Sequence, residues 1–329
     1  MSEDTLRNGT IIDDKYRVDR VLGQGAMGVV LLATHLELDQ RVAIKLLQSR
    51  YAERGEASTR FMREARACVK IQSEHVVRVL DVGKLESGGP YMVMEYLEGR
   101  DLANVLQDLG PLPISLAVEY VLQACDAVAA AHAAGIIHRD LKPGNLFLTT
   151  LSDRSEIVKV IDFGISKARL TDSDEAALTQ GAMLGSPLYM SPEQMMVSKD
   201  IDGRCDIWAL GIILYELLTG KPPFEAASMP QLCSLVLHTP PLAVRLVRPD
   251  VPMLLEEVIH RCLQKEPKAR LANVGELAMY LADFAPPSAA RLATRAMRFF
   301  QPGANSGSAR FSQPQNLISS SQGAKRGSA

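Results

Sequence analysis

Short runs of Val, Ile and Leu, broken by glycine and by polar turns, occupy the first part of the chain and predict β-strands. Several such runs lie between Tyr16 and Leu47, and two more lie at Val76–Val82 and Tyr91–Tyr96. Between these groups, apolar residues recur at helical spacing over Ser58–Gln72, which predicts one helix within the strand-rich part.

After Gly99 the pattern changes to long helical periods. Helices are predicted at Ile114–Ala134, Ile207–Thr219 and Leu254–Gln264, the first of them rich in Ala and free of Pro and Gly. The chain has no internal repeat. We therefore expect a small strand-rich part followed by a larger helical part.

Composition and charge exclude several classes of protein. With 329 residues, 47% hydrophobic and 22% charged, the chain is long and apolar enough for a folded core, unlike a disordered or fibrous protein. The formal net charge of −2 provides no general positive field, so we expect no nucleic-acid partner. The five cysteines are scattered and form no CxxC pair, which favours free thiols over a metal or redox site.

No targeting or membrane segment is expected. The first residues contain no apolar signal region, and the apolar stretch Ile207–Leu218 contains Glu216 and is too short to cross a bilayer. These features predict a cytoplasmic protein without a transmembrane span.

The last segment, 285–329, has a different composition. It holds six basic residues, no acidic residue and many Ser, Gly, Gln and Pro, which predicts a disordered tail. Arg291, Arg295 and Arg298 nevertheless recur at helical spacing beside apolar residues. The alternatives are a basic amphipathic helix that contacts anionic lipid or a partner, and a helix docked on the protein's own surface.

A glycine-rich turn and a lysine are the first candidates for chemistry. Gly23, Gly25 and Gly28 lie between two predicted strands, where the missing side chains let the backbone approach phosphate oxygens. A dinucleotide-binding loop would open a helix at this point, but a strand follows. Lys45 lies on the next strand and needs a carboxylate partner if it is buried, for which Glu64 is the candidate.

Two further motifs are much more specific. The sequence HRDLKPGN spans His138–Asn145, and DFG begins at Asp162. GSPLYMSPE follows at Gly185–Glu193, then DIWALG from Asp206, and finally Arg270. With this ordered set, the chain resembles the eukaryotic-type (Hanks-type) protein kinase family, and in particular its bacterial Ser/Thr kinases, over about residues 16–284.

The resemblance implies an α+β fold with two lobes. A small antiparallel-sheet lobe with one main helix is expected over about 16–94, after an N-terminal lead of residues 1–15. A larger, mainly helical lobe is expected over about 98–284. ATP would bind in the cleft between the lobes.

The resemblance also implies a role for each catalytic residue. Asp140 would accept or orient the proton of the substrate hydroxyl, and Lys142 would contact the γ-phosphate. Asn145 and Asp162 would hold Mg²⁺ through oxygen ligands. Lys45 would pair with the α- and β-phosphates, and Glu64 would hold Lys45 in place.

The nucleotide site would be formed by both lobes. Its expected members are Leu22, Gly23, Gln24, Gly25, Ala26, Met27, Gly28, Val29, Val30, Ala43, Lys45, Met94, Glu95, Leu97, Asp101, Phe147 and Asp162. Met94 would guard the back of the pocket, Phe147 would lie beneath the base, and Glu95 and Leu97 would offer backbone hydrogen bonds. Asp101 would hold either the ribose or a basic residue of the substrate.

Other residues of the family pattern are expected to support the site. Glu193 and Arg270 would form a buried ion pair, and Asp206 would anchor the catalytic loop through backbone N–H groups. His138, Phe163 and Cys68 would pack in an apolar column between the lobes.

Arg139, next to Asp140, suggests control by phosphorylation of the activation loop, with Lys167 as a second contact for the phosphate. Thr179 is the predicted phosphosite, with Thr171 and Ser173 as alternatives. Ser186 departs from the family, which usually has Thr there, but keeps the hydroxyl.

The sequence therefore predicts a non-specific serine/threonine protein kinase that uses ATP and Mg²⁺, acts on protein Ser/Thr hydroxyls, and can self-associate for autophosphorylation in trans. The alternatives are a pseudokinase-like binding scaffold and a small-molecule phosphotransferase. The catalytic set argues against the first alternative, and the Gly185–Glu193 segment with Arg270 argues against the second.

Overall fold

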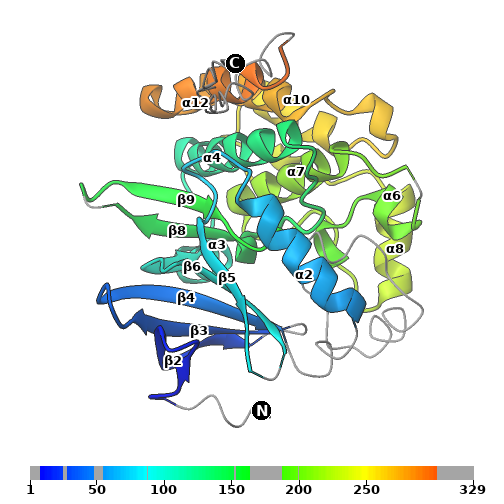
Figure 1. The fold of residues 1–329 in the computed structure, drawn as a ribbon. Coiled ribbons are helices and arrows are strands. Elements are labelled where there is room, and N and C mark those ends of the chain that lie inside the picture. The colour runs from blue at the N-terminus through cyan, green and yellow to red at the C-terminus, as the bar shows by residue number, and fades with distance from the viewer. Residues whose placement is uncertain are drawn as a thin grey trace, which may run out of the picture.

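The chain folds into a strand-rich lobe and a helical lobe (Figure 1). The computed structural model describes residues 8–24, 28–47, 55–86, 88–151, 153–163, 187–198 and 200–301. Within the helix at 55–68, it does not extend to the side chains at 55–57, 60, 64 and 67.

The smaller lobe is an antiparallel sheet with the strand order β1-β2-β3-β4-β6-β5. The strands are β1 (Ile11–Ile12), β2 (Tyr16–Gln24), β3 (Gly28–His35), β4 (Gln40–Leu47), β5 (Val79–Lys84) and β6 (Pro90–Glu95). The short β1 pairs with β2, so the end of the predicted N-terminal lead belongs to this sheet.

Side chains alternate between the two faces of this sheet. On β4, Val42, Ile44 and Leu46 pack into one apolar cluster, whereas Ala43 belongs to a second cluster on the opposite face. The second cluster is covered by helix α2 (Gly55–Cys68), whose Phe61 and Ala65 are buried there. Since Lys45 is two residues from Ala43, strand geometry directs it to the same face as α2.

The larger lobe is built around two buried helices, α4 (Ile114–Ala133) and α7 (Arg204–Thr219). The other helices are α3 (Leu102–Leu109), α6 (Pro192–Met195), α8 (Met229–His238), α9 (Val244–Val247), α10 (Met253–Cys262), α11 (Val274–Leu281) and α12 (Pro287–Arg298). In the described part of the chain, α4 is the one helix long and apolar enough to cross a membrane, but most of it is buried inside the protein, as in a core helix.

A second, three-stranded antiparallel sheet lies in the larger lobe, with the order β7-β8-β9. Its strands are β7 (Gly99–Asp101), β8 (Leu146–Thr150) and β9 (Glu156–Val160). This small sheet carries the segments that begin at His138 and end at Asp162, so it positions both specific sequence motifs.

The predicted elements agree with the observed ones to within a few residues, but the prediction for the end of the chain is partly wrong. Instead of beginning a disordered tail, residues 287–298 form α12, which packs against α11 and α4. Residues 302–329, which lie outside the described part, dominate the composition of 285–329. An average over the whole segment therefore does not reveal that Ala289, Ala293 and Ala296 are buried. Of the alternatives for this basic segment, the structure shows the helix docked on the protein's own surface.

The predicted ion pair between Glu193 and Arg270 is confirmed as a bidentate contact, with both N–O distances at 2.7 Å. The remaining N–H groups of the guanidinium donate to the carbonyl oxygens of Gln264, Lys265 and Arg204. Every donor of this buried cation is therefore used, which offsets the cost of its desolvation.

Removal of Arg270 should strongly destabilise the protein. Arg270→Ala leaves Glu193 buried without its cation, and we expect a loss of about 3–5 kcal/mol in the free energy of unfolding. Arg261→Ala is the matched control, since Arg261 forms a longer, half-exposed ion pair of 3.4 Å with Glu276 and should cost less than about 1 kcal/mol. Urea denaturation of both variants tests this, and equal losses would contradict it.

Candidate active site

An ion pair joins the two lobes at the centre of the site. Lys45 Nζ, on β4, lies 2.9 Å from Oδ1 of Asp162, which follows β9. The side chain of Lys45 is 17% exposed, so its charge is only partly solvated. That charge lowers the pKa of Asp162 below its usual value, although burial acts in the opposite direction. Asp162 is therefore held as a carboxylate.

The predicted partner Glu64 lies on α2, but its side chain is outside the description. The interaction between Glu64 and Lys45 therefore stays a prediction.

The catalytic loop is anchored by Asp206 in the first turn of α7, as expected. Its carboxylate accepts hydrogen bonds from the backbone N–H groups of His138 and Arg139, at 2.9 and 2.8 Å. It also accepts one from Nε2 of the His132 ring at 2.8 Å. Arg139 has a positive φ of 64°, which is costly for a residue with a side chain. The hydrogen bonds from Asp206 hold this strained backbone in place.

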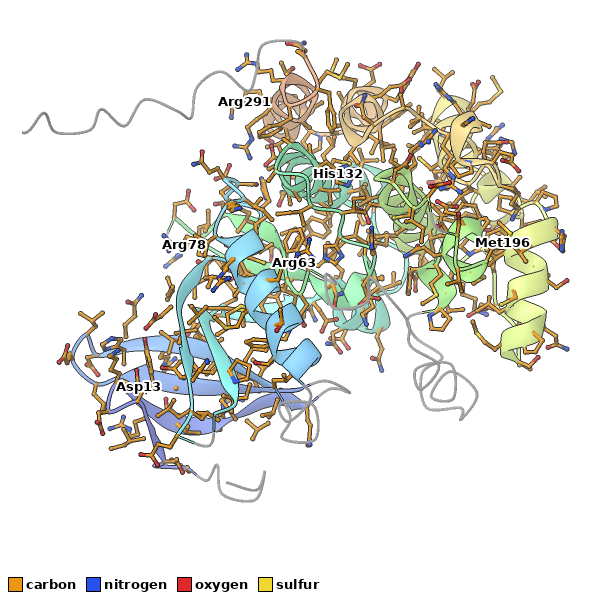
Figure 2. All side chains as sticks on the ribbon, turned by 45° about the vertical axis from the view of Figure 1, so that its right-hand side comes forward. Asp13, Arg63, Arg78, His132, Met196 and Arg291 are labelled. Carbon is orange, nitrogen blue, oxygen red and sulfur yellow. The ribbon has the colours of Figure 1, made fainter. Side chains whose placement is uncertain are left out.

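Burial of Asp206 raises its pKa, but the hydrogen bond and charge of His132, with the loop N–H groups, outweigh this effect. The net result is a pKa below the usual range for a carboxyl. Asp206 is therefore an anion inside the protein, and His132, also shown in Figure 2, lies deep within the helical lobe beside it.

His138 and Phe163 pack together as predicted, with 4.8 Å between ring centroids, and Cys68 belongs to the same buried cluster. Burial lowers the pKa of His138, so the imidazole is neutral at pH 7. Its Nδ1 accepts the backbone N–H of Asp140 at 3.3 Å. The apolar column thus contacts the catalytic loop directly.

Three polar residues of the catalytic loop converge on one point. The Asn145 amide donates to the carbonyl oxygen of Asp140 at 2.8 Å, and Lys142 Nζ lies 3.8 Å from Oδ2 of Asp140. The side chain of Asp140 is 13% exposed, and that of Lys142 is 30% exposed. The loop therefore presents a carboxylate and an ammonium group together at a partly solvated position.

The donor atoms fit a hard divalent cation. Because the NH₂ group of Asn145 is directed to Asp140, its amide oxygen is the atom that can act as a ligand. Asp162 contributes carboxylate oxygens, and its φ of 54° is again unusual for a residue with a side chain. Mg²⁺ prefers such oxygen ligands and keeps several waters, so two protein residues suffice.

Apolar side chains from both lobes lie at the positions expected to hold the base. Ala43 and Met94 are buried on facing positions of β4 and β6, and the partly buried Leu22, Val30 and Leu97 pack around them. Phe147 is partly buried on β8, opposite Asp101 of β7. These apolar residues come from both lobes, and ligand sites in proteins are commonly formed at such a junction.

Gly28 is required by the sheet itself, because a Cβ there would collide with the carbonyl oxygen of Leu46 on the neighbouring strand. A Cβ added to Gly23, in contrast, would meet no other described part of the chain within 4 Å. Gly25, Ala26 and Met27 lie outside the described residues, so the phosphate contacts of this loop stay a prediction.

The segment linking the lobes has a polar role that the sequence did not reveal. The Glu95 N–H donates to the carbonyl oxygen of Arg78 at 3.0 Å. Its carboxylate accepts from the Arg78 N–H and from Lys159 Nζ, both at 2.9 Å. Lys159 is buried and was not singled out, since a lysine in a strand resembles an exposed edge residue.

Asp101 also has a structural role that was missed. Its carboxylate caps α3, accepting the backbone N–H of Asn104 at 2.9 Å and the Asn104 side chain at 2.6 Å. An Asp immediately before a helical period is a recognised N-cap signal and could have been used to find it.

Comparisons with known proteins agree with this geometry. The family model described as protein kinase domain matches residues 16–280. The chain belongs to the protein kinase family. It is 41% identical over 261 residues to serine/threonine-protein kinase Pkn1 of Myxococcus xanthus, covering 79% of this chain and 36% of that protein.

The kinase domain has further relatives among bacterial enzymes. It is 34% identical over 293 residues to serine/threonine-protein kinase PknB of Mycobacterium leprae, covering 87% of this chain and 46% of that protein. The crystal structure of the Mycobacterium tuberculosis PknI kinase domain is similar with a TM-score of 0.64 and 27% identity, covering 85% and 99% of the two chains. This chain spans less than half the length of these two curated relatives.

The two-lobed kinase fold is therefore confirmed, as is the resemblance to bacterial Ser/Thr kinases. The structure brings together the predicted residues Lys45, Asp140, Lys142, Asn145 and Asp162. Two groups of contacts, Lys45 with Asp162 and Asp140 with Lys142 and Asn145, are joined where the Ile161 N–H donates to the carbonyl oxygen of Asn145. Thr179, its alternatives Thr171 and Ser173, Lys167 and Ser186 lie outside the described residues.

The charge on Asp206 should make a pH-dependent contribution to stability. Because its pKa is depressed in the folded state, the carboxylate stabilises the fold at neutral pH, and this stabilisation is lost as the pH falls through that pKa. Asp206→Asn should cost about 2–3 kcal/mol at pH 7. The difference in the free energy of unfolding between Asp206→Asn and the native chain should become smaller below about pH 4.

Urea denaturation between pH 7 and pH 3 measures this difference directly. A penalty that stays constant over the whole range would show that the charge of Asp206 is not what holds the loop.

Proposed function

We propose that this protein transfers the γ-phosphate of ATP to serine and threonine hydroxyls of proteins, with Mg²⁺ as the metal. The observation that carries the proposal is that Lys45 contacts Asp162, while the Ile161 N–H beside Asp162 donates to the carbonyl oxygen of Asn145, so the ion pair lies next to the Asp140–Asn145 loop segment. Phosphoryl transfer needs this combination, because it depends on positioning and charge neutralisation more than on covalent catalysis.

Asp140 acts on the nucleophile. Its carboxylate, only 13% exposed, accepts the proton of the substrate hydroxyl as the hydroxyl oxygen bonds to the γ-phosphorus. The bond between that phosphorus and the β–γ bridging oxygen breaks, and ADP leaves with the electron pair. The Asn145 amide and the His138 ring hold the main chain of Asp140, so the carboxylate keeps its direction during the transfer.

The two lysines neutralise phosphate charge. Lys142 lies beside Asp140, where its ammonium can contact the transferred group. Lys45 is on the opposite lobe, where it pairs with the α- and β-phosphates. Asp162 and Asn145 would hold Mg²⁺, which would supply positive charge against the phosphates.

The substrate class follows from the segments beside the catalytic loop. Lys142 within HRDLKPGN is the pattern of Ser/Thr kinases. Gln194, at the start of α6, donates to the carbonyl oxygen of Arg139 at 2.8 Å, and Ser191 caps the same helix. The segment expected to receive a protein substrate is thus tied to the catalytic loop, which supports a protein rather than a small molecule as acceptor.

Two further parts of the proposal concern context. Since the reaction consumes ATP, we propose that the domain acts in the cytoplasm. Autophosphorylation of Thr179, between two copies of the chain, would place a phosphate near Arg139.

The scaffold alternative predicts nucleotide binding without transfer, and one substitution separates the two. Asp140→Asn removes the proton acceptor but none of the expected nucleotide contacts, so transfer to a Ser/Thr peptide should fall by about a hundredfold or more. ATP affinity should stay within a few fold. Radiolabel transfer and calorimetric ATP titration measure the two quantities, and a native chain that binds Mg-ATP but transfers nothing would favour the scaffold.

Loss of the proposed phosphosite should lower activity. Thr179→Ala removes the hydroxyl whose phosphate would pair with Arg139, and we expect a several-fold decrease in transfer. Thr171→Ala and Ser173→Ala are the matched controls. Full activity of Thr179→Ala, with no phosphate found at residue 179 of the native chain by mass spectrometry, would reject this assignment.

A further inference from the structure

Helix α12 lies beyond the matched kinase segment and is held closely by the larger lobe. Ala289, Ala293 and Ala296 are buried at 3%, 1% and 0% exposure, forming one small-residue face against α11 and α4. A Cβ on Gly275 of α11 would lie 2.8 Å from Cα of Met297. The absence of side chains here lets the helices approach, so α12 is a fixed part of the domain.

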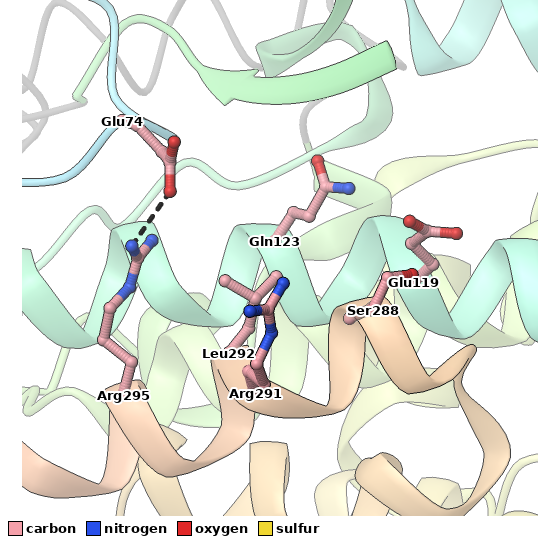
Figure 3. Close-up of a pocket in the computed structure, with 8 residues that line it drawn as sticks. Glu74, Glu119, Gln123, Ser288, Arg291, Leu292 and Arg295 are labelled. Atoms are coloured by element: carbon pink, nitrogen blue, oxygen red, sulfur yellow. Dashed lines mark hydrogen bonds and ion pairs between the residues drawn. The ribbon is translucent and has the colours of Figure 1, made fainter. Parts of the chain in front are cut away.

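One residue of α12 reaches out of this interface toward the other lobe. The Arg295 guanidinium contacts Asp126 of α4 with Nη2–Oδ2 at 2.6 Å, and Nη1 lies 2.9 Å from Oε1 of Glu74 (Figure 3). The side chain of Asp126 is 1% exposed, whereas that of Glu74 is 55% exposed. Arg295 thus neutralises a buried carboxylate and at the same time holds a residue of the segment that follows α2.

That segment, residues 73–77, is anchored from the same side by a second contact. Ser73 Oγ donates to Oδ2 of Asp126 at 2.6 Å, so the carboxylate that Arg295 neutralises also holds the start of the segment. A cavity of about 380 Å³ lies beside these residues, between α4 and α12. Glu74 lines this cavity, and its carboxylate is held there by the ion pair with Arg295.

The 73–77 segment is in turn bonded along β9. The Val160 N–H donates to the His75 carbonyl oxygen at 2.7 Å, and the Val77 N–H donates to the Val160 carbonyl oxygen at 3.1 Å. The buried His75 ring contacts the Val158 carbonyl oxygen at 3.0 Å. Val160 is two residues from Asp162, so the segment helps to fix the strand end that carries the proposed metal ligand.

The same segment is connected to the link between the lobes. Lys159 Nζ donates to the carbonyl oxygen of Glu74 and to the carboxylate of Glu95, both at 2.9 Å. Arg295 is therefore connected, through Glu74 and the bonds of the 73–77 segment, to the strand that leads to Asp162. Through Lys159 it is also connected to Glu95, whose backbone is expected to bind the base.

We propose that Arg295 is a positioning residue for phosphoryl transfer, acting through the 73–77 segment on β9 and Asp162. The proposal rests on the proposed kinase function. In metal sites, groups that orient the ligands without contacting the metal typically change metal affinity or activity by 10–100-fold when they are removed. Arg295 does not contact Asp162 itself and acts through the segment bonded to β9, so we expect an effect at the lower end of this range.

The test must separate positioning from simple loss of stability. Arg295→Ala leaves Asp126 buried and charged, which alone destabilises the fold. The double variant Arg295→Ala/Asp126→Asn removes that charge and should recover much of the lost melting temperature. Glu74→Ala breaks only the exposed contact and should leave stability nearly unchanged. Arg291→Ala is the matched control, because Arg291 is exposed on α12 and lines the same cavity.

If Arg295 is a positioning residue, the double variant and Glu74→Ala both show kcat lowered by about tenfold, with a higher Mg²⁺ concentration for half-maximal transfer. Arg291→Ala stays at the native values. A double variant that recovers both melting temperature and kcat would show that Arg295 is merely structural and would overturn the proposal.

Amide hydrogen exchange tests, independently of activity, whether Arg295 holds the 73–77 segment against β9. The amides of Val77 and Val160 should exchange about tenfold faster in the double variant and in Glu74→Ala, but not in Arg291→Ala. Unchanged exchange at both amides would overturn the proposal. A native chain that transfers no phosphate would contradict the proposed kinase function. The exchange data would still show whether Arg295 holds the 73–77 segment.

Discussion

The ion pair between Lys45 and Asp162 is the contact on which the geometry of the site depends. Its two partners belong to different lobes, and the distance of 2.9 Å between them brings β4 and the end of β9 together. Because each charge is partly removed from water, each side chain needs the other, and the pKa of Asp162 is lowered by the lysine. The ion pair thus keeps side by side the cation proposed to contact phosphates and the anion proposed to hold a metal.

Both partners are placed by the packing of the strands that carry or precede them. Lys45 takes its direction from strand alternation, with Ile44 and Leu46 buried on the opposite face. Asp162 takes its position from β9, which is hydrogen-bonded to the 73–77 segment and, through Gln123, to α4. The buried carboxylate of Asp206 holds the strained backbone at Arg139 in the same way. The site therefore rests on charges that are paired where they are shielded from water.

Most of the fold and the central site could be predicted from the sequence. Strand and helix periods located the lobes, and the HRDLKPGN and DFG motifs identified Asp140 and Asp162 through the resemblance to the protein kinase family that they carry. The missed features are long-range polar contacts. Lys159 is an ordinary residue in its strand, and its bonds to Glu74 and Glu95 depend on packing between three separate segments. Arg295 lies in a basic stretch whose average composition predicts disorder, and only the fold reveals Asp126 opposite it.

The proposed role of Asp162, as a ligand of the metal that couples nucleotide binding to transfer, is tested most directly by comparing ATP binding and phosphate transfer with and without Mg²⁺. For the native chain, we predict that Mg²⁺ raises ATP affinity and is required for transfer. For Asp162→Asn, we predict that metal-free ATP affinity is retained within a few fold, while the effect of Mg²⁺ on affinity and the transfer itself are lost. Transfer by Asp162→Asn at the native rate, with its Mg²⁺ dependence intact, would contradict this account of the site.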